Sequence, residues 1–77
     1  MKVTLYRTEY CPWCHKAEEL FKKHNIKHVS IDVGKDQKAA HDMVEKSGQQ
    51  GVPVIDIDGT IIVGYDEPKL RKLLHIK

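Results

Sequence analysis

Two cysteines lie three positions apart in the segment Cys11-Pro12-Trp13-Cys14. A pair of thiols at this spacing can exchange electrons with a disulfide, because one sulfur attacks and the other lies close enough to displace the product. Pro12 lacks a backbone N–H and suits the first position of a helix, so Cys11 is predicted to be the N-cap. A thiolate there faces unpaired N–H groups and the positive end of the helix dipole. The segment therefore predicts a redox centre with two catalytic thiols, in which Cys11 attacks and is displaced readily and Cys14 lies one turn further along.

Three other roles for the cysteines fit the sequence less well. A buried structural pair does not account for their spacing on a helix that begins with proline. A zinc site needs about four ligands, and the chain has no second C-x-x-C pair. His15 completes C-x-x-C-H, the pattern of covalent haem attachment, but the strand-rich patterning and the missing export signal argue against haem. We therefore expect no metal, and we interpret the remaining histidines as surface or packing residues.

The composition indicates one small domain whose chemistry takes place at its surface. The chain has 77 residues, a net charge of +2 and 31% charged residues. We therefore expect a single domain over residues 1–77 and no strongly basic face for nucleic acid. No apolar run approaches the roughly 18 residues that span a membrane, and the Met1-Lys2 start reaches a charge too soon for a secretory signal. A cytoplasmic location is expected, where structural disulfides are rare.

Apolar periodicity divides the chain into strands and helices. Strands are predicted over residues 2–7, 29–33, 54–57 and 60–63. Helices are predicted to begin at Pro12, after a cap at Asp36, and near Pro68. The first helix should stop at Asn25 and the second at Gly48, since both residue types tolerate left-handed backbone. The predicted order is β-α-β-α-β-β-α, and the first β-α-β unit should cross over right-handedly and pair its strands in parallel.

The same periodicity predicts the faces of these elements. One face of the first helix carries Trp13, Ala17, Leu20, Phe21 and His24. In the second strand, Val29, Ile31 and Val33 alternate with polar residues, as expected when one face of a strand is buried. Asp58-Gly59 is a strong signal for a two-residue hairpin turn. Glu18 stands four residues before Lys22, the spacing of a stabilising ion pair along a helix.

Three segments together resemble the glutaredoxin family of the thioredoxin-fold superfamily. The first is Thr8 to Ala17 around Cys-Pro-Trp-Cys, where glutaredoxins usually have CPYC. The second is Ser47 to Pro53, which resembles the family's TVP loop, and the third is Val63 to Glu67, which resembles its GGxDD segment with Val63 in place of the first glycine. With the element order, the resemblance covers essentially the whole chain. It implies an α/β thioredoxin fold, a four-stranded mixed sheet flanked by three helices.

The resemblance also implies glutathione as a co-substrate and gives roles to matching residues. Pro53 is expected in the cis form, and the backbone of Val52 is expected to pair with the cysteine part of glutathione. Tyr65 and Asp66, which open the last helix, are expected to hold the γ-glutamyl group, since helix N-termini favour anions. The full set of expected glutathione-binding residues is Trp13, Gln50, Val52, Pro53, Gly64, Tyr65 and Asp66.

Two positions depart from the family pattern at the other end of glutathione. Thr8 stands where glutaredoxins often have Lys, and Gln49 stands where they often have Arg. Those cations hold the glycine carboxylate, and their loss should weaken binding by about 1–3 kcal/mol if charged hydrogen bonds become neutral. Gln50, Lys16 and Lys38 are the candidates to replace them.

The sequence thus predicts a glutathione-dependent thiol–disulfide oxidoreductase. It is expected to act as a monomer and to reduce protein disulfides and glutathione mixed disulfides through Cys11 and Cys14. One alternative within the same fold is a redoxin that thioredoxin reductase reduces and that donates electrons to ribonucleotide reductase; the Gly64-to-Pro68 segment fits this reading loosely. A different class also stays open, in which the protein binds an iron–sulfur cluster through Cys11 and glutathione without catalysis.

Overall fold

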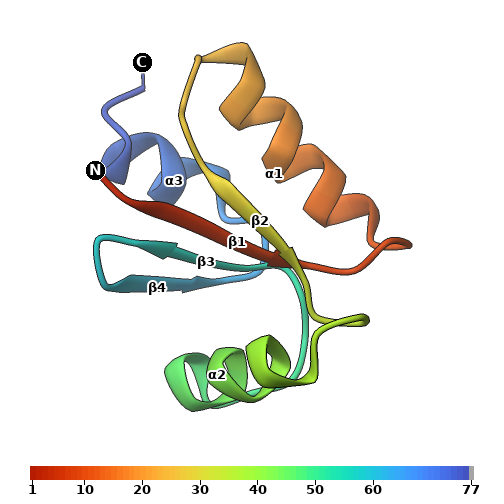
Figure 1. Ribbon diagram of the computed structural model, residues 1–77. Coiled ribbons are helices and arrows are strands. Elements are labelled where there is room, and N and C mark those ends of the chain that lie inside the picture. The colour runs from red at the N-terminus through yellow and green to blue at the C-terminus, as the bar shows by residue number, and fades with distance from the viewer. Residues whose placement is uncertain (77) are drawn as a thin grey trace.

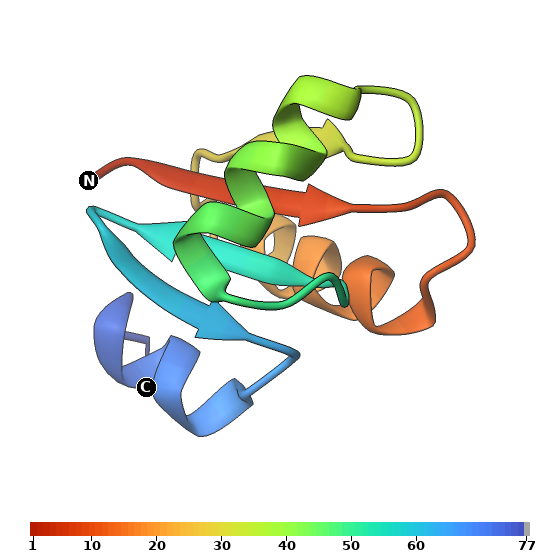
Figure 2. The same cartoon turned by 90° about the horizontal axis from the view of Figure 1, so that it is seen from below.

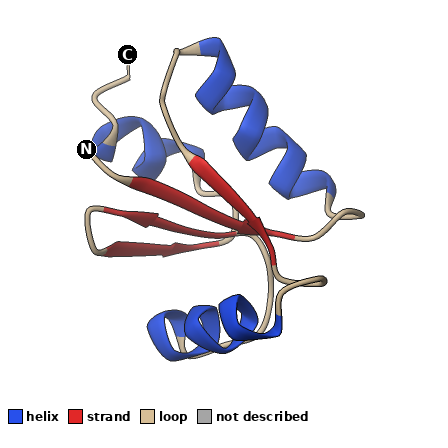
Figure 3. Ribbon diagram, in the orientation of Figure 1, coloured by secondary structure: helices blue, strands red, loops and turns tan. Residues whose placement is uncertain are grey.

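The computed structural model describes residues 1–76, and its elements follow the predicted β-α-β-α-β-β-α order (Figures 1 and 3). The elements are β1 (Val3–Arg7), α1 (Pro12–Lys23), β2 (Val29–Asp32), α2 (Gln37–Ser47), β3 (Val54–Ile57), β4 (Thr60–Val63) and α3 (Glu67–Leu73). The four strands form one sheet in the order β2-β1-β3-β4. Strand β1 pairs in parallel with β2 and antiparallel with β3, and β4 pairs antiparallel with β3. The predicted mixed sheet is therefore confirmed, and β1 is one of its two central strands.

The sheet lies between two helical layers. Helices α1 and α3 cover one face and α2 covers the other (Figures 1 and 2). Successive side chains of a strand point to opposite faces, so Val3 and Leu5 enter the core with α1 and α3, while Tyr6 enters the core with α2. Because β1 is buried on both faces, its carboxyl end is held firmly where the chain turns toward the two cysteines.

Helix α1 keeps most of its predicted buried face. Ala17, Leu20 and Phe21 are buried in the main core, and the chain leaves the helix through Asn25, whose φ of 55° lies in the left-handed region as expected. Trp13 departs from the prediction, because its side chain is 56% exposed. It lies in the first turn, and its ring stacks on Tyr65 at the surface instead of entering the core.

Strand β2 shows less alternation of buried and exposed side chains than the sequence predicts. Ile31 and Val33 pack partly buried against the α2 side of the sheet, whereas Val29 is 56% exposed. Strand β2 is an edge strand, and its N-terminal end carries Val29 away from the cluster that contains the α2 side chains. An edge strand can leave an apolar side chain in water at this end because only one neighbouring strand shields it.

The hairpin between β3 and β4 turns where the sequence predicts. Asp58 and Gly59 have φ values of 50° and 93°, as a turn with two left-handed central residues requires. The Asp58 carboxylate accepts a hydrogen bond from the backbone N–H of Lys2 (2.7 Å), which ties the hairpin to the start of β1. Among residues 1–76, no helix is both long and apolar enough to cross a membrane.

Candidate active site

Cys11 occupies the N-cap of α1, as predicted from the proline that follows it. Its backbone is extended, Pro12 begins the helix, and its Sγ accepts a hydrogen bond from the backbone N–H of Cys14 (3.2 Å). Both cysteines are free thiols. Cys11 retains 9% exposure, whereas Cys14 has none. Both cysteines are thus buried, and Cys11, at the helix N-terminus, is the one that keeps some contact with solvent.

The environment of Cys14 keeps its thiol protonated. The pKa of Cys14 is raised to about 12, mainly by burial, with smaller contributions from a hydrogen bond and charge repulsion from Cys11. A hydrogen bond with the backbone of Thr8 and the positive charge of Arg7 act in the opposite direction. The two thiols thus differ in their surroundings: Cys11 lies at the helix N-terminus, and Cys14 is a buried thiol that stays protonated at neutral pH.

Trp13 and Tyr65 form one wall of a surface groove between α1 and α3. Their ring centroids are 6.0 Å apart and their planes differ by 25°. The Lys16 ammonium lies 5.6 Å from the Trp13 ring centroid, close enough for a cation–π interaction. The groove has a volume of about 340 Å³, and Arg71 also lines it. The structure therefore brings together Trp13 and Tyr65, two of the residues expected to bind glutathione.

The Val52–Pro53 bond is cis, as the resemblance implied. The carbonyl oxygen of Pro53 accepts a hydrogen bond from the N–H of Gly64 (2.8 Å), which joins this loop to the segment before α3. Gly64 has a φ of 82°, a conformation that favours glycine. Asp66 is the N-cap of α3, and its carboxylate accepts from the N–H of Lys69 (3.2 Å). Pro53 and Gly64 are thus linked through the backbone, and Asp66 caps the helix that follows.

Gln50 lies in a second groove, on the α2 side of the sheet. This groove has a volume of about 430 Å³ and is lined by Thr8, Val33, Gly34, Ala40, His41, Met43, Val44 and Gln50. Thr8 stands three residues before Cys11 in the chain. Of the predicted site residues, Trp13 and Tyr65 line the first groove and Gln50 lines the second, whereas neither lining includes Cys11, Cys14, Val52, Pro53, Gly64 or Asp66.

The amide of Gln49 is engaged within its own loop. Its Oε1 accepts from the N–H of Gly51 (2.6 Å), and its Nε2 donates to the carbonyl of Gly51 (2.9 Å). Lys16, a candidate to replace the missing cations, lies in the groove with Tyr65 and not in the groove with Thr8 and Gln50. Lys38 is exposed on α2 and lines neither groove. Of the three candidates, only Gln50 lies in the groove with Thr8.

Sequence reasoning missed a polar cluster behind the two cysteines. Arg7, at the end of β1, lies 3.3 Å from the Glu18 carboxylate of α1 (Nε to Oε1). The same carboxylate accepts a hydrogen bond from the Ser30 hydroxyl (2.9 Å) and lies 3.8 Å from Nδ1 of His15. In place of the expected Glu18–Lys22 pair along the helix, Glu18 makes this contact between α1 and the sheet. The only signal in the sequence was a charged residue at the end of an otherwise buried strand.

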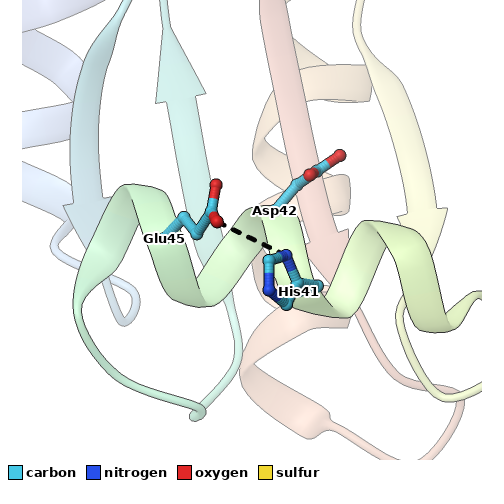
Figure 4. Close-up of side chains that lie close together, drawn as sticks. All are labelled: His41, Asp42 and Glu45. Atoms are coloured by element: carbon cyan, nitrogen blue, oxygen red, sulfur yellow. Dashed lines mark ion pairs between the residues drawn. The ribbon is translucent and has the colours of Figure 1, made fainter.

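A group of side chains that could act as metal ligands lies on α2. His41, Asp42 and Glu45 project from adjacent turns, and His41 lies 3.6 Å from Glu45 (Figure 4). The side chains of His41 and Glu45 are 72% and 68% exposed. Solvated side chains one turn apart on a helix pair in this way without a metal, so the arrangement does not by itself indicate a metal site.

Comparisons with known proteins agree with this geometry. Residues 3–62 match the Glutaredoxin family. The chain is 44% identical over 73 residues to an uncharacterized glutaredoxin-like 8.6 kDa protein of the rubredoxin operon of Clostridium pasteurianum, covering 95% of this chain and 97% of the relative. It is 31% identical over 65 residues to glutaredoxin 3 of Escherichia coli K12, covering 84% and 78%.

A solved structure gives the same result for the fold. A mutant of the thioredoxin-like protein BC3987 superposes with a TM-score of 0.92 at 29% identity, covering 97% of this chain and 96% of that protein. The predicted thioredoxin fold is therefore confirmed. The paired cysteines at the start of α1, the shared fold and these relatives together show that the chain belongs to the glutaredoxin family, whose members are generally thiol–disulfide oxidoreductases.

Proposed function

We propose that this protein is a dithiol oxidoreductase that reduces protein disulfides and glutathione mixed disulfides with electrons from glutathione. The observation that carries the proposal is the arrangement of the two sulfurs: Cys11 Sγ is at the N-cap of α1 and accepts from the N–H of Cys14, whose own thiol is buried. An anion is stabilised at a helix N-terminus by the free N–H groups and the dipole. Cys11 is thus suited both to attack a disulfide and to leave when attacked.

The reaction follows from this difference between the thiols. The Cys11 thiolate attacks the glutathione sulfur of a mixed disulfide, a Cys11–glutathione bond forms, and the protein thiolate leaves and takes up a proton. A second glutathione thiolate then attacks the glutathione sulfur of that intermediate, giving oxidised glutathione and the Cys11 thiolate. With a protein disulfide, the Cys11 thiolate attacks one of the two substrate sulfurs and forms a mixed disulfide, and the other substrate sulfur leaves as a thiolate that takes up a proton. Cys14 then loses its proton and attacks Cys11, which releases the first substrate sulfur. The Cys11–Cys14 disulfide forms, the reduced substrate leaves, and two glutathione molecules restore the dithiol.

Glutathione is proposed to lie across the segments that converge near Cys11. The backbone of Val52, before cis Pro53, pairs with its cysteine part, and Trp13 walls the groove. Its γ-glutamyl group meets the backbone after Gly64, where the N–H groups of Tyr65 and Asp66 precede α3. Gln50 contacts the glycine end. The linked Pro53 and Gly64 backbones and the stacked Trp13 and Tyr65 rings support this assignment.

One observation, at the place where the glycine carboxylate of glutathione is expected to bind, favours a second candidate for the reductant. Thr8 is neutral, and the Gln49 amide is already engaged with Gly51, so neither position provides a cation for the glycine carboxylate. A site of this kind can also serve a redoxin that takes electrons from thioredoxin reductase and passes them to ribonucleotide reductase. In both cases we propose a cytoplasmic monomer formed as one domain by residues 1–77, with no resident metal.

The choice between the two reductants can be made in one experiment. The oxidised protein is mixed with glutathione, glutathione reductase and NADPH, or with thioredoxin reductase and NADPH, and NADPH consumption is followed with a small disulfide as the final acceptor. We expect turnover with glutathione to be the faster of the two. Turnover with thioredoxin reductase alone would contradict the glutathione assignment while leaving the dithiol chemistry intact.

Restoring a cation beside Cys11 should improve the use of glutathione. We expect Thr8→Lys to lower KM for a glutathione mixed disulfide about three- to tenfold, because a charged hydrogen bond to the glycine carboxylate is stronger than a neutral one. The measurement is the steady-state KM at constant glutathione. Thr60→Lys adds the same charge on β4 and should leave KM unchanged; an equal change in both variants would show only a general effect of charge.

A further inference from the structure

The step in which Cys14 attacks Cys11 requires a proton to leave a buried thiol. In the mixed disulfide, the sulfur of Cys11 is bonded and carries no charge. The repulsion and the hydrogen bond by which Cys11 raises the pKa of Cys14 are therefore removed at the moment when Cys14 must react, whereas burial remains. What favours the Cys14 thiolate at that stage has to come from groups other than Cys11.

Arg7 is the charged side chain placed to act on Cys14. It is the last residue of β1, and by strand alternation it shares a face with Val3 and Leu5, which pack against α1. Its partner Glu18 lies on α1 four residues after Cys14, and residues four apart share one face of a helix. The guanidinium therefore lies along the strip of α1 that carries Cys14, and its positive charge lowers the pKa of that thiol.

The guanidinium contacts Glu18 of α1, and Glu18 is in turn held by Ser30 and lies near His15. Glu18 holds it at 3.3 Å, and both side chains are only about a fifth exposed, at 20% and 18%. Ser30 on β2 donates to the other oxygen of Glu18 (2.9 Å). His15 lies 3.8 Å from Glu18 and also donates from Nε2 to the carbonyl of Glu9 (3.1 Å), in the loop before Cys11.

The ion pair does not use the Nε–H donor of Arg7. This atom is buried, and although it is 3.3 Å from Glu18, it has no partner with hydrogen-bond geometry. The guanidinium charge acts on a nearby anion with or without a hydrogen bond, and it lowers the pKa of Cys14 despite the contact with Glu18. The groups that bear on Cys14 are thus the Thr8 backbone, Arg7 and Cys11, with Glu18 and His15 one contact further away.

We propose that Arg7 is a positioning residue for the second half of the reaction, in which its guanidinium, held by Glu18, stabilises the thiolate of Cys14 as that sulfur displaces the product from Cys11. The inference rests on the proposed dithiol function. In this step the proton of Cys14 passes to solvent, the Cys11–Cys14 bond forms, the bond between Cys11 and the substrate sulfur breaks, and the departing thiolate takes up a proton. No other oxidant or reductant is required.

The test separates the two halves of the reaction. The reduced protein is mixed in a stopped-flow instrument with an aromatic disulfide that releases a yellow nitrothiobenzoate each time a sulfur is displaced. The first phase, proportional to reagent concentration, reports attack by Cys11. The second phase, independent of reagent concentration, reports attack by Cys14 on the mixed disulfide. We expect Arg7→Gln to slow the second phase about three- to tenfold at neutral pH, to move its rate–pH profile to higher pH, and to leave the first phase unchanged.

Two further variants show whether the charge is responsible. Arg7→Lys, which keeps the charge, should restore most of the second-phase rate, and Lys72→Gln, which removes a remote exposed charge on α3, should change neither phase. If Arg7→Lys is as slow as Arg7→Gln with an unshifted pH profile, the role is only structural and the inference is wrong. It is also wrong if Arg7→Gln leaves the second phase unchanged. If the unmodified protein shows no second phase, the proposed dithiol function itself fails.

Discussion

Cys11→Ser should abolish turnover in a glutathione-coupled disulfide assay, with a loss of at least about a thousandfold. A serine hydroxyl at the N-cap keeps the helix start but is not ionised at neutral pH, and the thiolate is the form that attacks a disulfide. Serine is a good N-cap residue, so folding should be preserved. The measurement is NADPH consumption with glutathione, glutathione reductase and a mixed disulfide of glutathione with a small thiol.

Cys14→Ser is the matched control, because it removes the other sulfur with the same substitution. Reduction of a glutathione mixed disulfide needs only Cys11 and a second glutathione, so Cys14→Ser should retain activity on that substrate. It should lose the reduction of protein disulfides, for which the second sulfur has to displace the product. If Cys14→Ser were inactive and Cys11→Ser active on the mixed disulfide, the roles assigned to the two cysteines would be reversed.

Local features of the site were predictable from the sequence because they depend on a few adjacent residues. Pro12 sets the start of α1, and the N-cap position of Cys11 follows from it. Asp58-Gly59 fixes a turn for the same reason, since its left-handed backbone suits few other residue pairs. The parallel pairing of β1 with β2 followed from the handedness of the connection between them. The cis form of Pro53 came from the resemblance to the family, because a local sequence seldom determines it.

The contacts of three other side chains were not predictable in this way. Glu18 has an i,i+4 partner in the sequence, but its carboxylate is taken by Arg7 and Ser30 from two neighbouring strands. Trp13 fits the buried stripe of α1, yet it stacks on Tyr65, 52 residues further along the chain. The Gln49 amide is bound to Gly51 within its own loop, a local contact that the sequence did not indicate. The contacts of Glu18 and Trp13 depend on which segments the fold brings together, and hydrophobic periodicity carries no information on that.

Alkylation of the reduced protein should distinguish the two thiols by a wide margin. At pH 8, iodoacetamide is expected to modify Cys11 and to leave Cys14 almost unmodified. With a pKa of about 12 for Cys14, its thiolate fraction at pH 8 is about one in ten thousand, since four pH units separate the two values. The thiol also has no exposed surface. The measurement is mass spectrometry of the peptides that contain each cysteine after a short reaction.

The dependence of this labelling on pH follows from the direction of the shift. Below its pKa, a thiol gains about tenfold in thiolate for each pH unit, so modification of Cys14 should rise from pH 8 to pH 10 while it stays the slower site. Two of the causes that raise the pKa of Cys14 come from Cys11. Cys14 should therefore be alkylated faster in the Cys11→Ser variant than in the unmodified protein. Burial is the largest cause of the raised pKa and remains in that variant. The increase in the alkylation rate of Cys14 should therefore be smaller in Cys11→Ser than in protein unfolded in guanidinium. Equal labelling of both cysteines in the folded protein would mean that Cys14 is not shielded, and the separation of roles between the two sulfurs would lose its physical basis.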